Sequence, residues 1–269
     1  MMHTQTHFFT NRWLSLVTAF LALLLLFIMT GANASAQALP TTADSAHTSI
    51  ILTVDRTDDT AAAQACTDAP NDCSLRGAII KANQQVSSTI FFLSVANPYQ
   101  LTIAPDGVND AATGDLNITA DVYMDGLGGR GACTPTDCQR PLIQGGASGN
   151  QWLDRIFRVG NGATVTLASL DIRHGGHPAL ETGGGLLVTA QAHLTLLDSR
   201  LYDHTARHGA GLAVDQGALI LRKSSILDNN ADLAGGGLWL GPRQRPTLKL
   251  ARLAPIAPAA VAASPIWAP

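Results

Sequence analysis

The side chains best suited to chemistry lie in one short run, Asp171-Ile172-Arg173-His174. A strand that buries Ile172 would turn both Asp171 and Arg173 outward, because alternate side chains of a strand share a face. Asp171 as an acid and Arg173 as a base are the catalytic candidates of this chain, and the reaction that they suggest is polysaccharide cleavage. Hydrolysis needs two flanking carboxylates, and elimination needs a bound cation such as Ca²⁺ as well as a base. A single Asp–Arg pair therefore favours a solvated surface over a catalytic site.

Four histidines have spacings that a metal could use, in the pairs His174/His177 and His204/His208. All four fall in predicted turns, and no strand or helix places them on one face. We expect solvated loop histidines, no metal site and no cofactor, with Ca²⁺ as the one ion to consider.

The first 36 residues have the pattern of a signal peptide. Arg12 precedes an uncharged apolar run from Trp13 to Met29, and small residues follow up to Ala36. This order predicts cleavage after Ala36. The alternative is an uncleaved N-terminal anchor, because the run is slightly long for a signal peptide.

Export changes the interpretation of the four cysteines. They form two close pairs, Cys66 with Cys73 and Cys133 with Cys138. An even number in an exported chain favours disulfides, and local pairing is the simplest connectivity. A zinc site with four sulfur ligands is the alternative, but these spacings fit it poorly.

Two stretches of the second half repeat the same pattern, and a third begins before the tail. Glycine triplets start at Gly183, Gly209 and Gly235, which are 26 residues apart, and a leucine closes each one. The repeat residues are Gly183, Gly184, Gly185, Leu186, Gly209, Gly211, Leu212, Gly235, Gly236, Gly237 and Leu238. A period of this length indicates stacked units, none of which buries its apolar face alone.

Each unit contains short alternating runs separated by turn residues, such as His193-Leu194-Thr195-Leu196. This texture predicts an all-β chain, with about three strands in each unit of roughly 25 residues. A parallel β-helix has three strands in each turn of about this length. The glycines suit the corners between strands, where the backbone needs a positive φ angle. A β-sandwich with accidental internal similarity is the alternative.

One helix is expected at the start of the array, over Ser74–Asn83. Asp72 or Ser74 can cap it, and apolar residues at i, i+3, i+4 and i+7 form one stripe. The residues expected in this capping helix are Ser74, Leu75, Arg76, Ala78 and Ile79. An apolar stripe would cover the open end of a β-helix and block edge-to-edge association.

The run from Cys73 to Ile79, with Cys66 before it and Ala82-Asn83 after it, resembles the CSLREA domain of secreted bacterial β-helix proteins. The downstream units resemble the repeats of polymorphic outer-membrane proteins, whose Gly-Gly-x-aliphatic motif is matched from Gly184 and from Gly236. The resemblance implies export, a right-handed β-helix and a cell-surface, outer-membrane or extracellular setting, with no established catalytic residue. Two positions depart from it: Gly77 replaces a Glu, and His204 stands where an Asn is expected.

These features divide the chain into five parts: a signal peptide (1–36), a linker (37–48), a CSLREA-like cap with the first coils (49–146), repeat coils (147–240) and a Pro/Ala-rich tail (241–269). The repeat stops at residue 240, so we expect the tail to be disordered or to result from a truncated reading frame.

Residues 37–240 contain 12 basic and 20 acidic side chains, and this negative excess argues against nucleic acid as a partner. We expect an exported, non-enzymatic binding or structural module that contacts glycans or cell-surface proteins. Membrane contact would come through the N-terminal segment or a missing C-terminal one. The alternative is a polysaccharide lyase or glycoside hydrolase on the same scaffold, because a fold does not determine function.

Overall fold

The structure is a computed structural model that describes residues 49–93, 98–128, 139–146, 152–177, 179–189, 191–241 and 248–250. The described residues are mostly β-strands, which lie in parallel sheets, and they include one helix, α2 (Leu75–Ala82). No helix among them is long and apolar enough to cross a membrane. The predicted signal peptide, the linker up to residue 48 and the Cys133–Cys138 pair lie outside the described residues.

The largest sheet, called sheet 1 here, has the strand order β1-β2-β5-β8-β11-β15-β19. Its strands are Ile50–Val54 (β1), Ser87–Phe92 (β2), Asp121–Asp125 (β5), Thr164–Ala168 (β8), His193–Leu197 (β11), Ala218–Arg222 (β15) and Leu248–Leu250 (β19). All neighbours in this sheet pair in parallel.

Three further sheets are also parallel. Sheet 2 contains Leu238–Leu240 (β18), Leu212–Val214 (β14), Leu186–Val188 (β10), Phe157–Val159 (β7) and Leu116–Ile118 (β4). Sheet 3 contains Ser225–Leu227 (β16), Arg200–Tyr202 (β12), Asp171–Arg173 (β9), Leu142–Gly145 (β6) and Tyr99–Leu101 (β3). Sheet 4 pairs Thr205–His208 (β13) with Asn230–Ala234 (β17).

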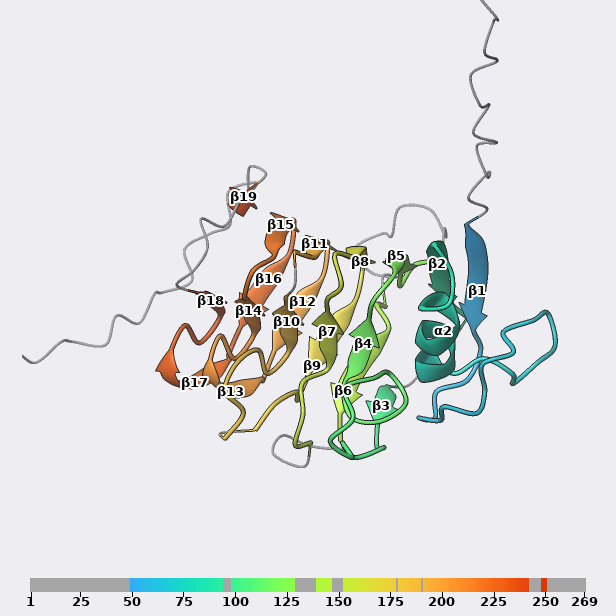
Figure 1. Ribbon diagram of the computed structural model, residues 1–269, viewed down its shortest axis with the longest axis horizontal. Helices are drawn as coiled ribbons and strands as arrows, with labels where there is room; N and C mark the ends of the chain where they lie inside the picture. The colour runs from blue at the N-terminus through green and yellow to red at the C-terminus, as the bar shows by residue number, and fades with distance from the viewer. Residues whose placement is uncertain are drawn as a thin grey trace, which may run out of the picture. The chain divides into compact units, whose positions relative to one another are not determined.

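The chain visits the three large sheets in rotation. It passes from β7 in sheet 2 to β8 in sheet 1 and β9 in sheet 3, and then returns to sheet 2 with β10. Strands one repeat apart therefore lie side by side, as the row from β4 to β18 shows in Figure 1. The predicted register is confirmed, because Leu186 pairs with Leu212 and Leu212 pairs with Leu238.

The corners between strands repeat as regularly as the strands. Gly183, Gly209 and Gly235 have φ angles of 69°, 56° and 67°, a region that glycine enters without steric cost. The predicted positive φ at the glycine triplets is therefore confirmed at their first residue.

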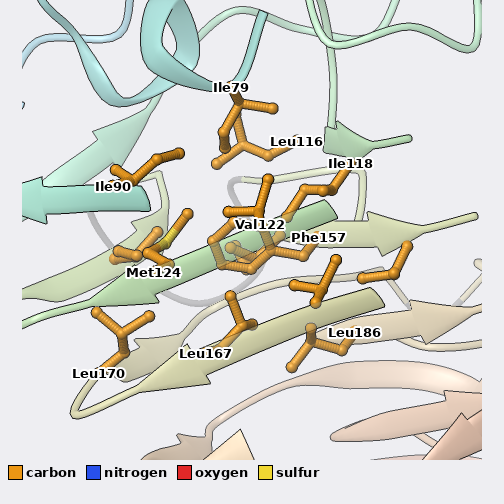
Figure 2. Close-up of a cluster of buried hydrophobic side chains, with 14 of the residues drawn as sticks. Ile79, Ile90, Leu116, Ile118, Val122, Met124, Phe157, Leu167, Leu170 and Leu186 are labelled. Atoms are coloured by element: carbon orange, nitrogen blue, oxygen red, sulfur yellow. The ribbon is translucent and has the colours of Figure 1, made fainter. Parts of the chain in front are cut away.

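The core consists of the side chains that the strands turn inward. In sheet 2, Phe157, Leu186 and Leu212 form one buried row. Figure 2 shows part of this core, with Ile79 of α2 pointing towards Leu116 of β4. Successive repeat units thus bury one another's apolar residues, which none could do alone.

Helix α2 lies against β1, β2 and β4. The Ser74 hydroxyl caps it by accepting a hydrogen bond of 2.9 Å from the Gly77 amide. The expected apolar stripe is buried, and Leu75 and Ile79 are 3% and 0% exposed. The helix thus covers apolar residues at the first strands of sheets 1 and 2.

Gly77, the departure from the CSLREA pattern, has a packing reason. A Cβ at this position would lie 1.9 Å from the carbonyl oxygen of Ala63. Glycine lowers helix stability by about 1 kcal/mol relative to alanine, but here it lets the preceding loop pass directly over the helix.

Side chains next to α2 occupy the free hydrogen-bonding groups of two edge strands. The Asn83 amide donates to the Asn117 carbonyl (2.8 Å) and accepts from the Thr119 amide (2.9 Å), at the edge of β4. Asp59 accepts from the amides of Thr102 (2.7 Å) and Ile103 (2.8 Å), just after β3. These edges cannot pair with another strand in the same way.

Cys66 and Cys73 form a disulfide with a Cα–Cα distance of 4.4 Å, as expected for the first cysteine pair. The bond closes the loop that leads into α2. Both half-cystines are buried, at 8% and 0% exposure.

The predicted tail after residue 240 contains one further strand. Leu248–Leu250 forms β19 and pairs in parallel with β15, so part of the predicted tail extends sheet 1. The physical reason is that an unpaired edge strand offers free amide and carbonyl groups to any segment of extended chain nearby.

Candidate functional site

The outward face of sheet 3 carries the acid–base candidates, but they do not form the expected pair. Ile172 is fully buried and Asp171 is nearly so, at 7% exposure. The Asp171 carboxylate accepts two hydrogen bonds from the guanidinium of Arg200, including one of 2.7 Å from Nε. Residues two apart on a strand are separated by about 7 Å, whereas neighbouring strands lie about 4.8 Å apart. The cross-strand partner is therefore the closer one.

Arg173 belongs to a separate row of polar side chains on the same face. Gln100, Gln144, Arg173 and Tyr202 are paired in register across β3, β6, β9 and β12. Gln144 donates to the Gln100 side-chain oxygen (3.4 Å), and Arg173 Nε donates to that of Gln144 (2.9 Å). Within the part of the chain that the structure describes, no carboxylate lies within 4.0 Å of the Arg173 guanidinium.

A hollow of about 270 Å³ lies at the Gln100 end of this row. It is lined by Gln100, Leu101, Thr102, Ala104, Pro105, Gly146, Trp152 and Leu153. The Trp152 indole is held by a hydrogen bond of 2.9 Å to the Arg155 carbonyl. The hollow thus combines apolar walls with the amide of Gln100.

A second hollow of about 270 Å³ lies on the outward face of sheet 1. Its lining is rich in hydroxyl groups: Ser49, Ser87, Ser88, Thr89, Asp121, Val122, Tyr123, Thr164 and Thr166. Thr89, Tyr123 and Thr166 form one outward row in register across β2, β5 and β8, with Tyr123 40% exposed. Asp121 is fixed by accepting a hydrogen bond of 2.7 Å from the Thr164 amide. We call this surface the hydroxyl groove.

Sequence reasoning missed the hydroxyl groove because the first coils lack the glycine triplets that set the register of the later ones. The alternation Val122-Tyr123-Met124 was a usable signal, since it predicts that Tyr123 points outward. Nothing in the sequence placed Thr89 or Thr166 beside it.

The histidine prediction was wrong for His204, which is buried at 1% exposure. Its Nδ1 accepts a hydrogen bond of 2.9 Å from the Gly175 amide, and Nε2 lies 3.1 Å from the Ile172 carbonyl. The ring therefore occupies backbone hydrogen-bonding groups of Gly175 and Ile172, at and just after β9. Burial lowers the pKa of His204 to about 3.

The other three histidines are partly buried. The Nδ1 of His177 accepts from the Ala179 amide, and His208 lies in β13 beside Glu181 and Trp239. Burial is the main cause that lowers the pKa of His174. Across the described ranges, no group of three or more His, Cys, Asp or Glu side chains is placed to hold a metal ion.

Two neighbouring acidic residues, of which Asp115 is buried, also escaped sequence reasoning. Arg155 Nη1 lies 3.0 Å from the Asp115 carboxylate and 3.7 Å from that of Asp154. Burial, followed by the charge of Asp154, raises the pKa of Asp115 to about 6. The Asp115 side chain is only 5% exposed, so a polymer cannot reach it, and the cluster serves to join the starts of β4 and β7.

Comparisons with protein-family models, with curated proteins and with solved structures give no match to this chain.

Proposed function

We propose that the described sheets form a right-handed parallel β-helix, that α2 is the cap of a CSLREA-like domain, and that the later coils are related to polymorphic outer-membrane repeats. The rotation of the chain through three parallel sheets and the one-repeat register support the β-helix. The capped, buried helix over the first strands supports the domain assignment.

We propose further that this is an exported, non-enzymatic surface module that binds neutral glycans. The hydroxyl groove carries this proposal, because it combines an exposed aromatic ring with many hydroxyl groups. A sugar presents apolar C–H faces and a rim of hydroxyl groups, which suit an aromatic ring and polar side chains respectively.

The rigidity of the groove favours binding. Apart from Ser49, its residues lie on β2, β5 and β8, which are paired on both sides, so little conformational entropy is lost when a ligand binds. The Asp121 carboxylate adds a hydrogen-bond acceptor and disfavours anionic ligands through charge repulsion. We therefore assign neutral sugars to this face.

The test compares Tyr123→Ala with the unmodified protein on a panel of neutral oligosaccharides, by isothermal titration calorimetry. Loss of the ring should weaken binding by about threefold to tenfold, the range for one aromatic contact. Tyr202→Ala is the matched control, because it removes a tyrosine from sheet 3 and should leave this affinity unchanged. Equal affinities for Tyr123→Ala and the unmodified protein would exclude the hydroxyl groove.

Export is tested separately. Expression of the whole sequence in a bacterium with an outer membrane should give a protein whose N-terminus, read by mass spectrometry, follows Ala36. A protein that keeps its first 36 residues would support the membrane anchor instead.

A further inference from the structure

We propose that Arg173, held in place by Gln144 and flanked by Tyr202, binds the carboxylate of an acidic polysaccharide, and that the hollow beside Gln100 receives a neighbouring sugar ring. This second site lies on sheet 3 and does not depend on the neutral-glycan site of sheet 1. We call it the arginine row.

The first argument is charge. Asp171, the nearest acid along β9, is already neutralised by Arg200. The groups beside Arg173 in register are the Gln144 amide and the Tyr202 phenol, and both are neutral at pH 7. Next to Arg173 in the chain, burial and the arginine charge itself lower the pKa of His174. Among the described residues, no carboxylate lies within 4.0 Å of the Arg173 guanidinium, so its positive charge has no ion-pair partner there.

The second argument is orientation. The hydrogen bond from Arg173 Nε to Gln144 fixes one edge of the planar guanidinium, and Gln144 is in turn held by Gln100. The structure shows no bond from either Nη atom to a described side chain. These two nitrogens can donate in parallel to both oxygens of a carboxylate, which is the strongest geometry for such a pair.

The third argument is the space along the row. Gln100 and Arg173 are two strands apart, or about 10 Å, with Gln144 between them. The hollow of about 270 Å³ opens at Gln100 and has Trp152 and Leu153 in its wall. A chain molecule bound at Arg173 would thus find apolar contact and an amide further along. A polymer fits this layout better than a small anion does.

The experiment measures the affinity of the full chain for polygalacturonate and alginate, with pullulan as a neutral polymer and dextran sulfate as a sulfated one. Arg173→Ala should weaken binding to both uronate polymers by about tenfold or more, the loss expected for a charged hydrogen bond. Arg173→Lys should recover only part of this, because an ammonium group cannot donate as a fork.

Arg222→Ala is the matched control. It removes an exposed arginine from sheet 1, and it should leave uronate binding unchanged. Tyr123→Ala should also leave it unchanged, so failure of the hydroxyl groove and failure of the arginine row give different results. Melting temperatures of all variants establish that each one is folded.

Three outcomes would overturn the inference: no uronate binding by the folded protein, an equal loss in Arg222→Ala and Arg173→Ala, or tighter Arg173-dependent binding of dextran sulfate than of either uronate polymer. The last result would assign the row to sulfate groups.

Discussion

Arg76 in helix α2 and Asp59 in the preceding loop form an ion pair whose side chains are 0% and 1% exposed. The remaining guanidinium hydrogen bonds go to the carbonyls of Ala111 and Gly114, both at 2.9 Å. Asp59 in turn holds the chain just after β3. One pair thus connects the helix, the loop before it and the loop between β3 and β4.

Asp59→Ala should destabilise the protein by about 3–5 kcal/mol, because it leaves the Arg76 charge buried without a partner. Urea denaturation measures this. Glu181→Ala is the control, since it breaks an exposed pair with Arg207 and should cost no more than about 1 kcal/mol. Similar small losses in both variants would show that the Asp59–Arg76 pair is not buried.

Gly77→Ala separates helix propensity from packing. Propensity alone predicts stabilisation by about 1 kcal/mol. The contact with the Ala63 carbonyl predicts the opposite sign, because the loop or the helix must move to admit a methyl group. A lower melting temperature supports the close approach, and a higher one contradicts it.

Asp115 should make the folded state less stable as pH rises from about 4 to 6. Its pKa is raised to about 6 in the folded protein, so the folded state holds this proton more tightly than the unfolded state does. Carbon NMR of the carboxyl group should show a midpoint near pH 6. Asp115→Asn should remove the corresponding decline in unfolding free energy, and an ordinary midpoint near that of exposed aspartates would refute the assignment.

His204 should make the folded state less stable as pH falls, the opposite of the effect of Asp115. Its pKa is lowered to about 3, so the unfolded state binds the proton first as pH falls. The neutral ring contributes its full stabilisation above pH 6.5, the ordinary pKa of histidine. As pH falls from there towards 3, the free energy of unfolding should decrease by about 1.4 kcal/mol for each pH unit. His204→Asn, which introduces the residue found one coil later at Asn229, should flatten this loss. His193→Asn, at an exposed position, should not.

The sequence by itself determined the periodic features. The glycine triplets and the alternating leucines predicted the register of the later coils, because identical units that stack must place equivalent residues side by side. The stripe from Leu75 to Ala82 predicted the helix and its buried face for the same kind of reason, since local periodicity decides which side of an element is apolar.

Only the tertiary structure decided which neighbouring polar side chains form an ion pair or a hydrogen bond. Asp171 pairs with Arg200, 29 residues away, because the neighbouring strand is closer than the next outward residue of its own strand. His204 turned out to be buried because backbone groups of the preceding coil bind its ring, and no pattern within its own segment reveals those partners. Partner choice depends on distances between strands that are remote in the chain, whereas strand and helix patterns depend on neighbours within a few residues.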